Sequence, residues 1–312
     1  MTSHPSVAEA GPDLALAYES GVEVAARSQW AYARLRFRRH RLAVVSLVAL
    51  VLFGLVAVFA KQIAPYGYDE QNYDLLYHAP TLDGWHVLGT DELGRDYLSR
   101  VIYGLQTSLW VAFFVAFVST LIGTVIGAIS GYYGGTIDNL LMRFTDLILV
   151  IPLLAVLLAA ASFLNQDGSP FKAALLIAAL IWVGLARILR GLFLSLRQKE
   201  FVEAAKASGA SDLRIIVRHI LPNCIGPIVV TMTLIVAGAI LLEAALSFLG
   251  FGIKPPHPSI GSLIDSGADA GLQAWWLVTF PGLVIALVAL AINFVGDGLR
   301  DALDPTQRRV RA

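Results

Sequence analysis

The chain has 312 residues, of which 57% are hydrophobic and only 15% are charged. A soluble domain usually has about 25% charged residues, so this composition indicates a protein of the lipid bilayer. The 23 basic residues balance the 23 acidic ones, which gives no reason to expect a nucleic-acid partner. The single cysteine, Cys224, excludes an internal disulfide, a CxxC redox motif and a cysteine-based zinc site.

Residues 1–41 are predicted to form a cytoplasmic tail that is largely disordered. Its first 26 residues are polar, include proline and glycine, and have no sustained apolar period. The uncharged run at 42–60 follows. A cleaved signal peptide is the alternative, since basic residues precede the run and Val58 and Ala60 resemble a cleavage site. The run exceeds the typical 7 to 15 residues of a signal-peptide core, which favours a retained membrane helix.

Six stretches are apolar enough to cross a hydrocarbon core about 30 Å thick, for which a helix needs about 20 residues. The fourth is the weakest, because it spans only if Lys172 and Arg187 extend to the two interfaces. The sequence therefore predicts an all-α, polytopic membrane protein with six transmembrane helices. The predicted spans are residues 42–60, 105–130, 147–164, 173–186, 224–249 and 275–296.

The distribution of basic residues predicts the orientation, because short loops rich in Lys and Arg stay in the cytoplasm. With the N-terminus inside, 18 of the 23 Lys and Arg residues lie on the inner side. Both termini are then cytoplasmic, including a tail at 300–312. The segment 61–104 is extracytoplasmic, and a five-helix core occupies 105–299.

The outer segment ends in the string TDELGRDYLSRVIYG, which begins at Thr90. Thr90 or Asp91 is suited to cap a helix. Leu93, Tyr97 and Val101 then follow at helical spacing, so an amphipathic interfacial helix is expected before the second span. We interpret this helix as a structural element that packs against the outer face of the bundle, and a direct role in substrate binding is the alternative.

The cytoplasmic loop at 190–222 contains the string FVEAAKASGASDLRIIVRHILPN. Residues 201–208 favour a helix, and Gly209 suits its C-terminal stop because glycine adopts the left-handed conformation easily. Ser211 is expected to cap a second helix, which Pro222 would end. Its predicted apolar face comprises Leu213, Ile216, Val217 and Ile220. Two short helices of this kind are suited to transmit movement from a soluble partner to the membrane helices. The alternative is an ordinary cytoplasmic connector with solvated charges.

This loop resembles the cytoplasmic coupling signature of binding-protein-dependent ABC importers. That signature is EAA, three residues, Gly, nine residues, an aliphatic residue, any residue, then Leu-Pro. The matching positions are Glu203, Ala204, Ala205, Gly209, Leu221 and Pro222. His219 departs from the aliphatic position. The stretches at 88–104, 243–261 and 281–305 are similar to the C-type permease subunit of dipeptide and oligopeptide importers.

The resemblance implies a type I ABC importer transmembrane domain in the bacterial inner membrane. Its implied partners are a related permease subunit in a heterodimer, two ATPase subunits and an extracytoplasmic substrate-binding protein. Glu203, Ala204, Ala205, Lys206, Gly209, Leu221 and Pro222 are then the expected ATPase-coupling residues. Close relatives carry nickel chelates or glutathione, which remain alternative substrates.

The chain itself is not expected to be an enzyme. It contains no Gly-Lys dipeptide, so it has no phosphate-binding P-loop, and the G-x-S-x-G pattern of hydrolases is also missing. We assign no catalytic residue, metal ligand or cofactor to this chain. ATP and Mg²⁺ are expected on the partner ATPases.

Two acids within the predicted spans are costly in lipid and therefore functional candidates. Asp146 is expected to pair with Arg143, and a transport role is its alternative. Glu243 either faces the transport pathway or bonds to a neighbouring helix. Glycines at 123, 127 and 131 recur every four residues, which favours close helix packing.

Two other classes of function remain open at this point. An ion-coupled secondary carrier would use Asp146 or Glu243 to bind the driving ion, but such carriers usually have more helices and repeated halves. A non-transporting membrane scaffold would use the arginine-rich N-terminal segment to recruit partners.

Overall fold

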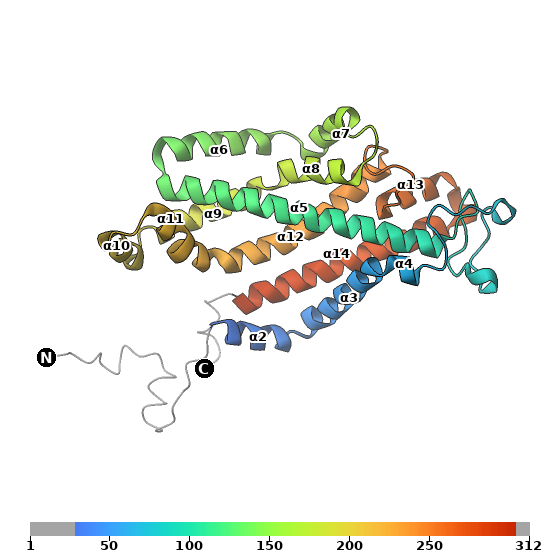
Figure 1. Cartoon of the computed structure of the whole chain (residues 1–312), viewed down its shortest axis with the longest axis horizontal. Coiled ribbons are helices and arrows are strands. Elements are labelled where there is room, and N and C mark those ends of the chain that lie inside the picture. The colour runs from blue at the N-terminus through green and yellow to red at the C-terminus, as the bar shows by residue number, and fades with distance from the viewer. Residues whose placement is uncertain (1–28, 304–312) are drawn as a thin grey trace, which may run out of the picture.

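The computed structural model describes residues 29–303, so the disorder predicted for the first 26 residues lies outside the described part of the chain. Long helices run side by side in an elongated bundle (Figure 1). Between residues 29 and 303 the only β-type pairing is an isolated bridge between Thr90 and Asp96. The prediction of an all-α membrane protein is confirmed.

The N-terminal part of the described chain consists of α2 (Gln29–Arg39), α3 (Arg41–Val58) and the short α4 (Ala60–Ile63). Helix α2 lies within the segment predicted as a tail. His40 separates α2 from α3, and its Nδ1 accepts a hydrogen bond of 3.1 Å from the Ala43 N–H. Because the imidazole caps α3 in this way, the first span begins directly after the arginine-rich helix.

The outer segment contains two 3-10 turns, η2 (Tyr73–Leu75) and η3 (Asp83–Trp85), and leads into α5 (Tyr97–Tyr133). The helix expected to lead into the second span begins at Tyr97 and is the first part of α5, one continuous helix of 37 residues. Its cap is Asp96, whose carboxylate accepts from the Ser99 N–H at 2.8 Å. The helix cannot begin earlier because Gly94 has a φ of 68°, and a side chain there would overlap the Asn72 carbonyl.

The third predicted span is broken into α6 (Gly135–Val150) and α7 (Leu153–Leu164), which meet at 87°. Pro152 lies in the break. A proline disfavours helical backbone at the residue before it, and Ile151 is extended, with φ −80° and ψ 133°. Helix α6 also begins 12 residues before the predicted start at 147.

The helix that carries the fourth predicted span is longer than that span. Helices α8 (Pro170–Ile181) and α9 (Val183–Leu196) together form a candidate span of 27 residues. The helix continues past Ala186, the predicted end of the span, and Arg187 and Arg190 lie inside it, where Asp146 and Asp138 of α6 pair with them. Pairing lowers the cost of a charge at the membrane, so the helix tolerates both arginines.

The second half of the chain begins with α10 (Glu200–Ala207), α11 (Asp212–Ile215) and the π turn η4 (Ile216–Ile220). The long helix α12 (Leu221–Phe248) follows. The outer helix α13 (Ile260–Asp269), the turn η5 (Gly271–Ala274) and α14 (Trp276–Leu303) complete the described chain. A hydrophobic core lies between α5, α8, α12, α13 and α14.

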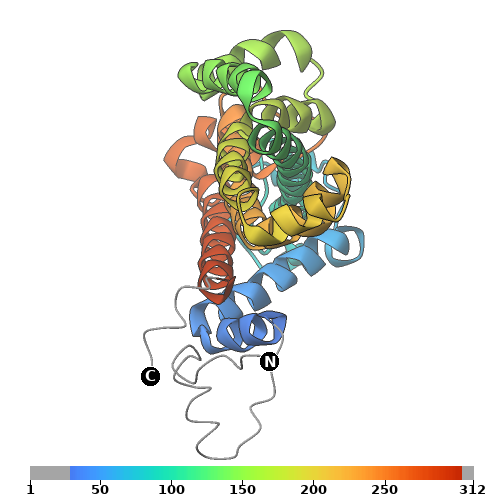
Figure 2. The ribbon, with the colours of Figure 1, turned by 90° about the vertical axis from the view of Figure 1, so that its left-hand side faces the viewer.

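The two ends of the bundle differ. Helices α10 and α11, the start of α2 and the end of α14 lie at one end, and α4, α13 and the outer segment lie at the other (Figure 1). Viewed from the first end, α10 and α11 lie across the long helices (Figure 2). Residues 29–303 provide five helices long and apolar enough to cross a membrane, or six if the bent α6–α7 pair counts as one span.

Candidate functional site

The three residues Glu203, Ala204 and Ala205 lie on α10, which ends in the left-handed turn predicted at Gly209. The Gly209 N–H donates to the Lys206 carbonyl at 2.9 Å, and the Ala210 N–H donates to the Ala205 carbonyl at 3.0 Å. These two bonds make a Schellman motif, which requires positive φ at the glycine. The φ of Gly209 is 79°. The turn therefore closes α10 and redirects the chain into α11.

Helix α10 has one anchored face and one free face. Val202 is fully buried and Ala205 is half-buried, and both pack into a second hydrophobic cluster at this end of the bundle. Glu203, Ala204 and Lys206 are exposed. The anchored face holds the helix to the bundle, so the exposed residues form a rigid surface.

The second helix of the loop continues into the fifth span instead of ending at Pro222. In the π turn η4, the Leu221 N–H bonds to the Ile216 carbonyl, five residues back. Pro222 then occupies the first turn of α12, where a missing N–H is tolerated. The predicted stop at Pro222 is wrong for this reason. Ser211 precedes α11 as predicted, but its side chain makes no capping hydrogen bond.

The π turn also changes which apolar residues are buried. Ile215 and Ile220 are fully buried, because residues five apart share a face in a π turn. Leu213 and Val217, predicted to lie on the buried face, are 71% and 53% exposed. Together with the half-exposed Phe201, they place apolar side chains on the outside of the loop. We use the name coupling surface for a set of exposed residues of this loop: Phe201, Glu203, Ala204, Lys206, Gly209, Leu213 and Val217.

Two long helices support the coupling surface through close contact. A side chain at Gly123 of α5 would meet the carbonyl of Trp182, the N-cap of α9, at 2.9 Å. One at Gly127 or Gly131 would meet the Ala186 or Arg190 carbonyl of α9 at 2.6 Å. The glycines therefore allow the two backbones to touch along three turns. The packing interpretation of this glycine repeat is supported.

An ion pair that the sequence analysis missed joins α9 to α6 near the same end. Arg190 donates from Nε and Nη2 to the two Asp138 carboxylate oxygens at 2.6 and 2.7 Å. Ser130 of α5 donates a further hydrogen bond to Asp138. A bidentate pair fixes both position and orientation. No sequence signal could have identified it, because the two charges are 52 residues apart.

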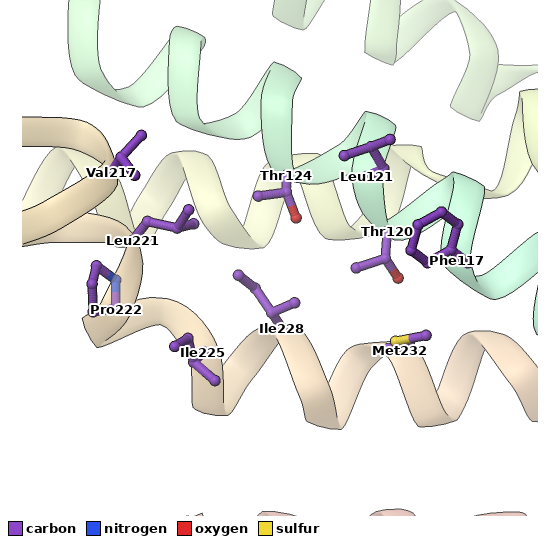
Figure 3. A pocket seen from close by; sticks show the side chains of 10 residues that line it. All are labelled: Phe117, Thr120, Leu121, Thr124, Val217, Leu221, Pro222, Ile225, Ile228 and Met232. Atoms are coloured by element: carbon purple, nitrogen blue, oxygen red, sulfur yellow. The ribbon is translucent and has the colours of Figure 1, made fainter. Parts of the chain in front are cut away.

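A groove of about 400 Å³ lies between α5 and the segment formed by η4 and α12, and Leu221 and Pro222, the last residues of the motif, line it (Figure 3). Its lining is apolar except for Thr120 and Thr124, which come from α5. Both threonine Oγ1 atoms are buried without a hydrogen-bond partner among the described residues. A hydroxyl without a hydrogen bond is costly in apolar surroundings, so these two threonines distinguish the groove from the rest of the apolar helix surface.

The two acids within the predicted spans have partners inside the chain. Asp146 pairs with Arg187 of α9, not with Arg143 as predicted, and both side chains are about half exposed. Glu243 is 1% exposed and accepts from Ser108 and Ser247, each at 2.7 Å. Ser108 belongs to α5, so the structure favours the helix-bonding alternative for Glu243. Neither acid lines the groove.

Among residues 29–303, no group of three or more His, Cys, Asp or Glu side chains is placed to hold a metal ion. The arrangement is suited to transmit movement. The exposed coupling surface is joined to a long apolar helix by the continuous helical segment Asp212–Phe248.

The helices define a multi-pass membrane protein with an exposed loop at one end of the bundle, and the comparisons specify its class. Residues 123–309 match the model of the binding-protein-dependent transport system inner membrane component. Residues 28–80 match the N-terminal TM domain of oligopeptide transport permease C. The chain belongs to the family of binding-protein-dependent transport system inner membrane components.

Individual relatives agree with this assignment. The chain is 41% identical over 291 residues to the oligopeptide transport system permease protein OppC of Escherichia coli K12, covering 93% of this chain and 96% of the relative. It is 44% identical over 270 residues to a putative peptide transport system permease protein of Brucella abortus biovar 1, covering 86% and 90%.

A solved structure supports the fold. The inward-facing MetNI methionine ABC transporter aligns with a TM-score of 0.52 at 18% identity, over 66% of this chain and 97% of that chain. At this identity the likeness concerns the fold alone.

Proposed function

We propose that the chain is a permease subunit of an ATP-driven importer. With a related permease subunit, it forms the pathway for dipeptides or oligopeptides across the bacterial inner membrane. The relatives named above support the peptide class, because their identity of 41 to 44% extends over most of both chains. The observation that carries the mechanism is the coupling surface, which is exposed and yet continuous with the fifth span.

The coupling surface is proposed to lie in the cytoplasm. It shares one end of the bundle with the start of α2 and the end of α14 (Figure 1). Arg34, Arg36, Arg38 and Arg39 lie on α2, and such clusters of positive charge remain inside. Both chain termini are cytoplasmic in this orientation.

Two soluble ATPase subunits are the proposed partners of the coupling surface. Small and apolar side chains permit close approach, and Glu203 and Lys206 offer charged contacts at its edge. ATP and Mg²⁺ bind to those subunits, and the permease hydrolyses nothing. Closure of the ATPase pair moves α10 as a rigid body, and α12 carries the motion into the membrane. An extracytoplasmic binding protein delivers the peptide to the opposite end.

The test is a charge reversal on the coupling surface. We expect Glu203→Arg, in a chain co-expressed with the ATPases and the second permease of its own operon, to lower ATPase recovery at least tenfold. A tenfold loss corresponds to about 1.4 kcal/mol of binding free energy. Quantitative co-purification measures it, and ATP-dependent peptide uptake into proteoliposomes should decrease in parallel.

Asp297→Arg is the matched control, because Asp297 is exposed near the end of α14 at the same end of the bundle. It reverses one charge without touching the coupling surface, so recovery should stay at the wild-type level. If Glu203→Arg retained the ATPases, or if wild-type complex imported peptide without them, the proposed function would be wrong.

A further inference from the structure

Tyr132, one residue before the C-terminal end of α5, lies where the coupling surface meets the membrane helices. Only 7% of this residue is exposed. Its ring belongs to the hydrophobic cluster that also contains Val202 of α10 and Ile215 of α11. Tyr132 therefore packs with apolar residues from both helices that flank the Gly209 turn.

Polar contacts from three segments converge on the same residue. The Tyr132 hydroxyl donates to the Asp212 carboxylate at 2.6 Å, and Asp212 is the first residue of α11. The Lys206 ammonium of α10 lies 5.7 Å from the centre of the ring, within the range of a cation–π interaction. The Tyr132 carbonyl accepts from Arg197 Nη1, just after α9, at 2.9 Å.

These contacts matter because α10 has little other attachment to the long helices. Apart from Val202 and Ala205, its side chains are exposed, and its neighbours in space are mainly α11 and η4. The hydroxyl–carboxylate bond is charge-assisted, which makes it short and directional. Tyr132 thus connects α10 and α11 to α5 independently of the backbone route through α12.

Helix α5 is suited to receive motion at this point. Its 37 residues form one uninterrupted helix, about 55 Å long at 1.5 Å per residue. That length exceeds the hydrocarbon core of about 30 Å. Helix α5 therefore extends from Tyr132 across the full thickness of that core to the outer segment at Tyr97.

We propose that Tyr132 is a positioning residue that couples movement of α10 and α11 to α5, so that ATP hydrolysis is converted into peptide transport. This inference rests on the proposed function. It assigns a second mechanical connection between the coupling surface and the membrane helices, in addition to the continuous α11–η4–α12 segment.

The test separates coupling from folding. Tyr132→Phe keeps the ring, its packing and the contact with Lys206 but removes the bond to Asp212. In the full transporter in proteoliposomes, we expect assembly to be unchanged and ATPase activity to stay within twofold of wild type. The number of ATP molecules hydrolysed per peptide imported should rise at least fivefold, a ratio that a merely structural role would not change.

Tyr133→Phe is the matched control, since Tyr133 is half exposed and its hydroxyl makes no hydrogen bond to any of residues 29–303. Its ratio should equal that of wild type. Asp212→Ala should reproduce the effect of Tyr132→Phe, whereas Asp212→Asn retains an acceptor and should keep most of the coupling. The double variant should be no worse than either single one, because both remove the same bond.

A wild-type ratio in both Tyr132→Phe and Asp212→Ala would overturn the inference, as would equal effects of Tyr132→Phe and Tyr133→Phe. If Tyr132→Phe did not assemble, the comparison of Asp212→Ala with Asp212→Asn would decide the question, because Asp212 is exposed and its replacement leaves the core intact. Failure of the proposed function would look different, because the wild-type complex would then contain no ATPase or would import no peptide with ATP.

Discussion

Gly209 controls the direction of the chain at the coupling surface through a single backbone dihedral. An added Cβ at Gly209 would meet no atom within 4 Å, so the site has room for a side chain. What restricts the position is its φ of 79°, which β-branched residues strongly disfavour. The cost of a substitution there is therefore conformational, not steric.

We expect Gly209→Val to destabilise the turn by about 1 to 3 kcal/mol, the usual cost of holding a non-glycine residue in left-handed backbone. The α10 helix would then lose its fixed angle to α11, and ATPase binding should weaken by about tenfold or more. Co-purification and peptide uptake measure the effect, and the amount of inserted protein should stay constant.

Gly209→Asn provides the control, because asparagine adopts the left-handed conformation far more readily than valine. It should retain most of the uptake. Equal losses in the two variants would show that the backbone conformation of Gly209 is not what matters.

Asp91 illustrates a residue whose role depends on distant neighbours. The sequence suggests a helix cap, but its carboxylate accepts from the Leu93 and Arg95 N–H groups and pairs with the side chains of Arg95 and Arg100. Asp91 and Arg100 are both buried. Removing one member of a buried pair costs about 3 to 5 kcal/mol, so this cluster orders the outer segment at the start of α5.

At the level of helices, the contact between α5 and α9 depends on small residues. Carbonyls of α9 lie where the side chains of three α5 glycines would be. In lipid no hydrophobic effect drives helices together, so close van der Waals contact provides the attraction. This contact holds α9 in place above the coupling surface.

Gly127→Ala should weaken this contact, because the new methyl group would meet the Ala186 carbonyl at 2.6 Å. Overpacking of this kind costs about 1 to 3 kcal/mol. The thermal unfolding midpoint of the purified protein should therefore decrease. Gly191→Ala, in the neighbouring helix, meets nothing within 4 Å and should leave the midpoint unchanged or raise it. A midpoint unaffected by Gly127→Ala would contradict the close approach of the two helices.

Charges inside α9 show what a sequence window leaves out. Arg187 and Arg190 look like the end of the fourth span, because the window registers their charge without their partners. Helix α6 supplies Asp146 and Asp138 to them, and the helix continues to Leu196. Paired charges cost less near the membrane than isolated ones, so the two arginines are tolerated within the helix.

For the whole molecule, the source of energy distinguishes the proposed importer from an ion-coupled carrier. A carrier needs an ionisable group that binds and releases its ion during transport. Glu243 and Asp146 are the candidates, and both are bonded within the chain, to two serines and to Arg187. Their contacts indicate structural roles.

We therefore expect the double variant Glu243→Gln and Asp146→Asn to retain ATP-dependent peptide uptake within about twofold. Glutamine can still bond to both serines, and asparagine can still accept from Arg187. Uptake into proteoliposomes with ATP inside, measured with and without a proton gradient, tests this. Loss of uptake in a complex that still contains its ATPases would instead favour the ion-coupled carrier.

The sequence by itself determined the membrane class, the family and the position of the coupling motif. Long apolar runs and the EAA-Gly-Leu-Pro spacing depend only on the order of residues, and so does the left-handed turn at Gly209. A glycine directly after a helix-forming stretch predicts the end of that helix, whatever lies next to it in space.

The tertiary structure alone decided where the helices end, which residues of the loop are buried and what holds α10 in place. The break at Pro152, the extension of α9 and the contacts of Tyr132 all depend on groups far apart in the chain. The energies of buried charges, hydroxyls and glycine contacts are set by neighbours in space, and one-dimensional patterns do not contain those neighbours.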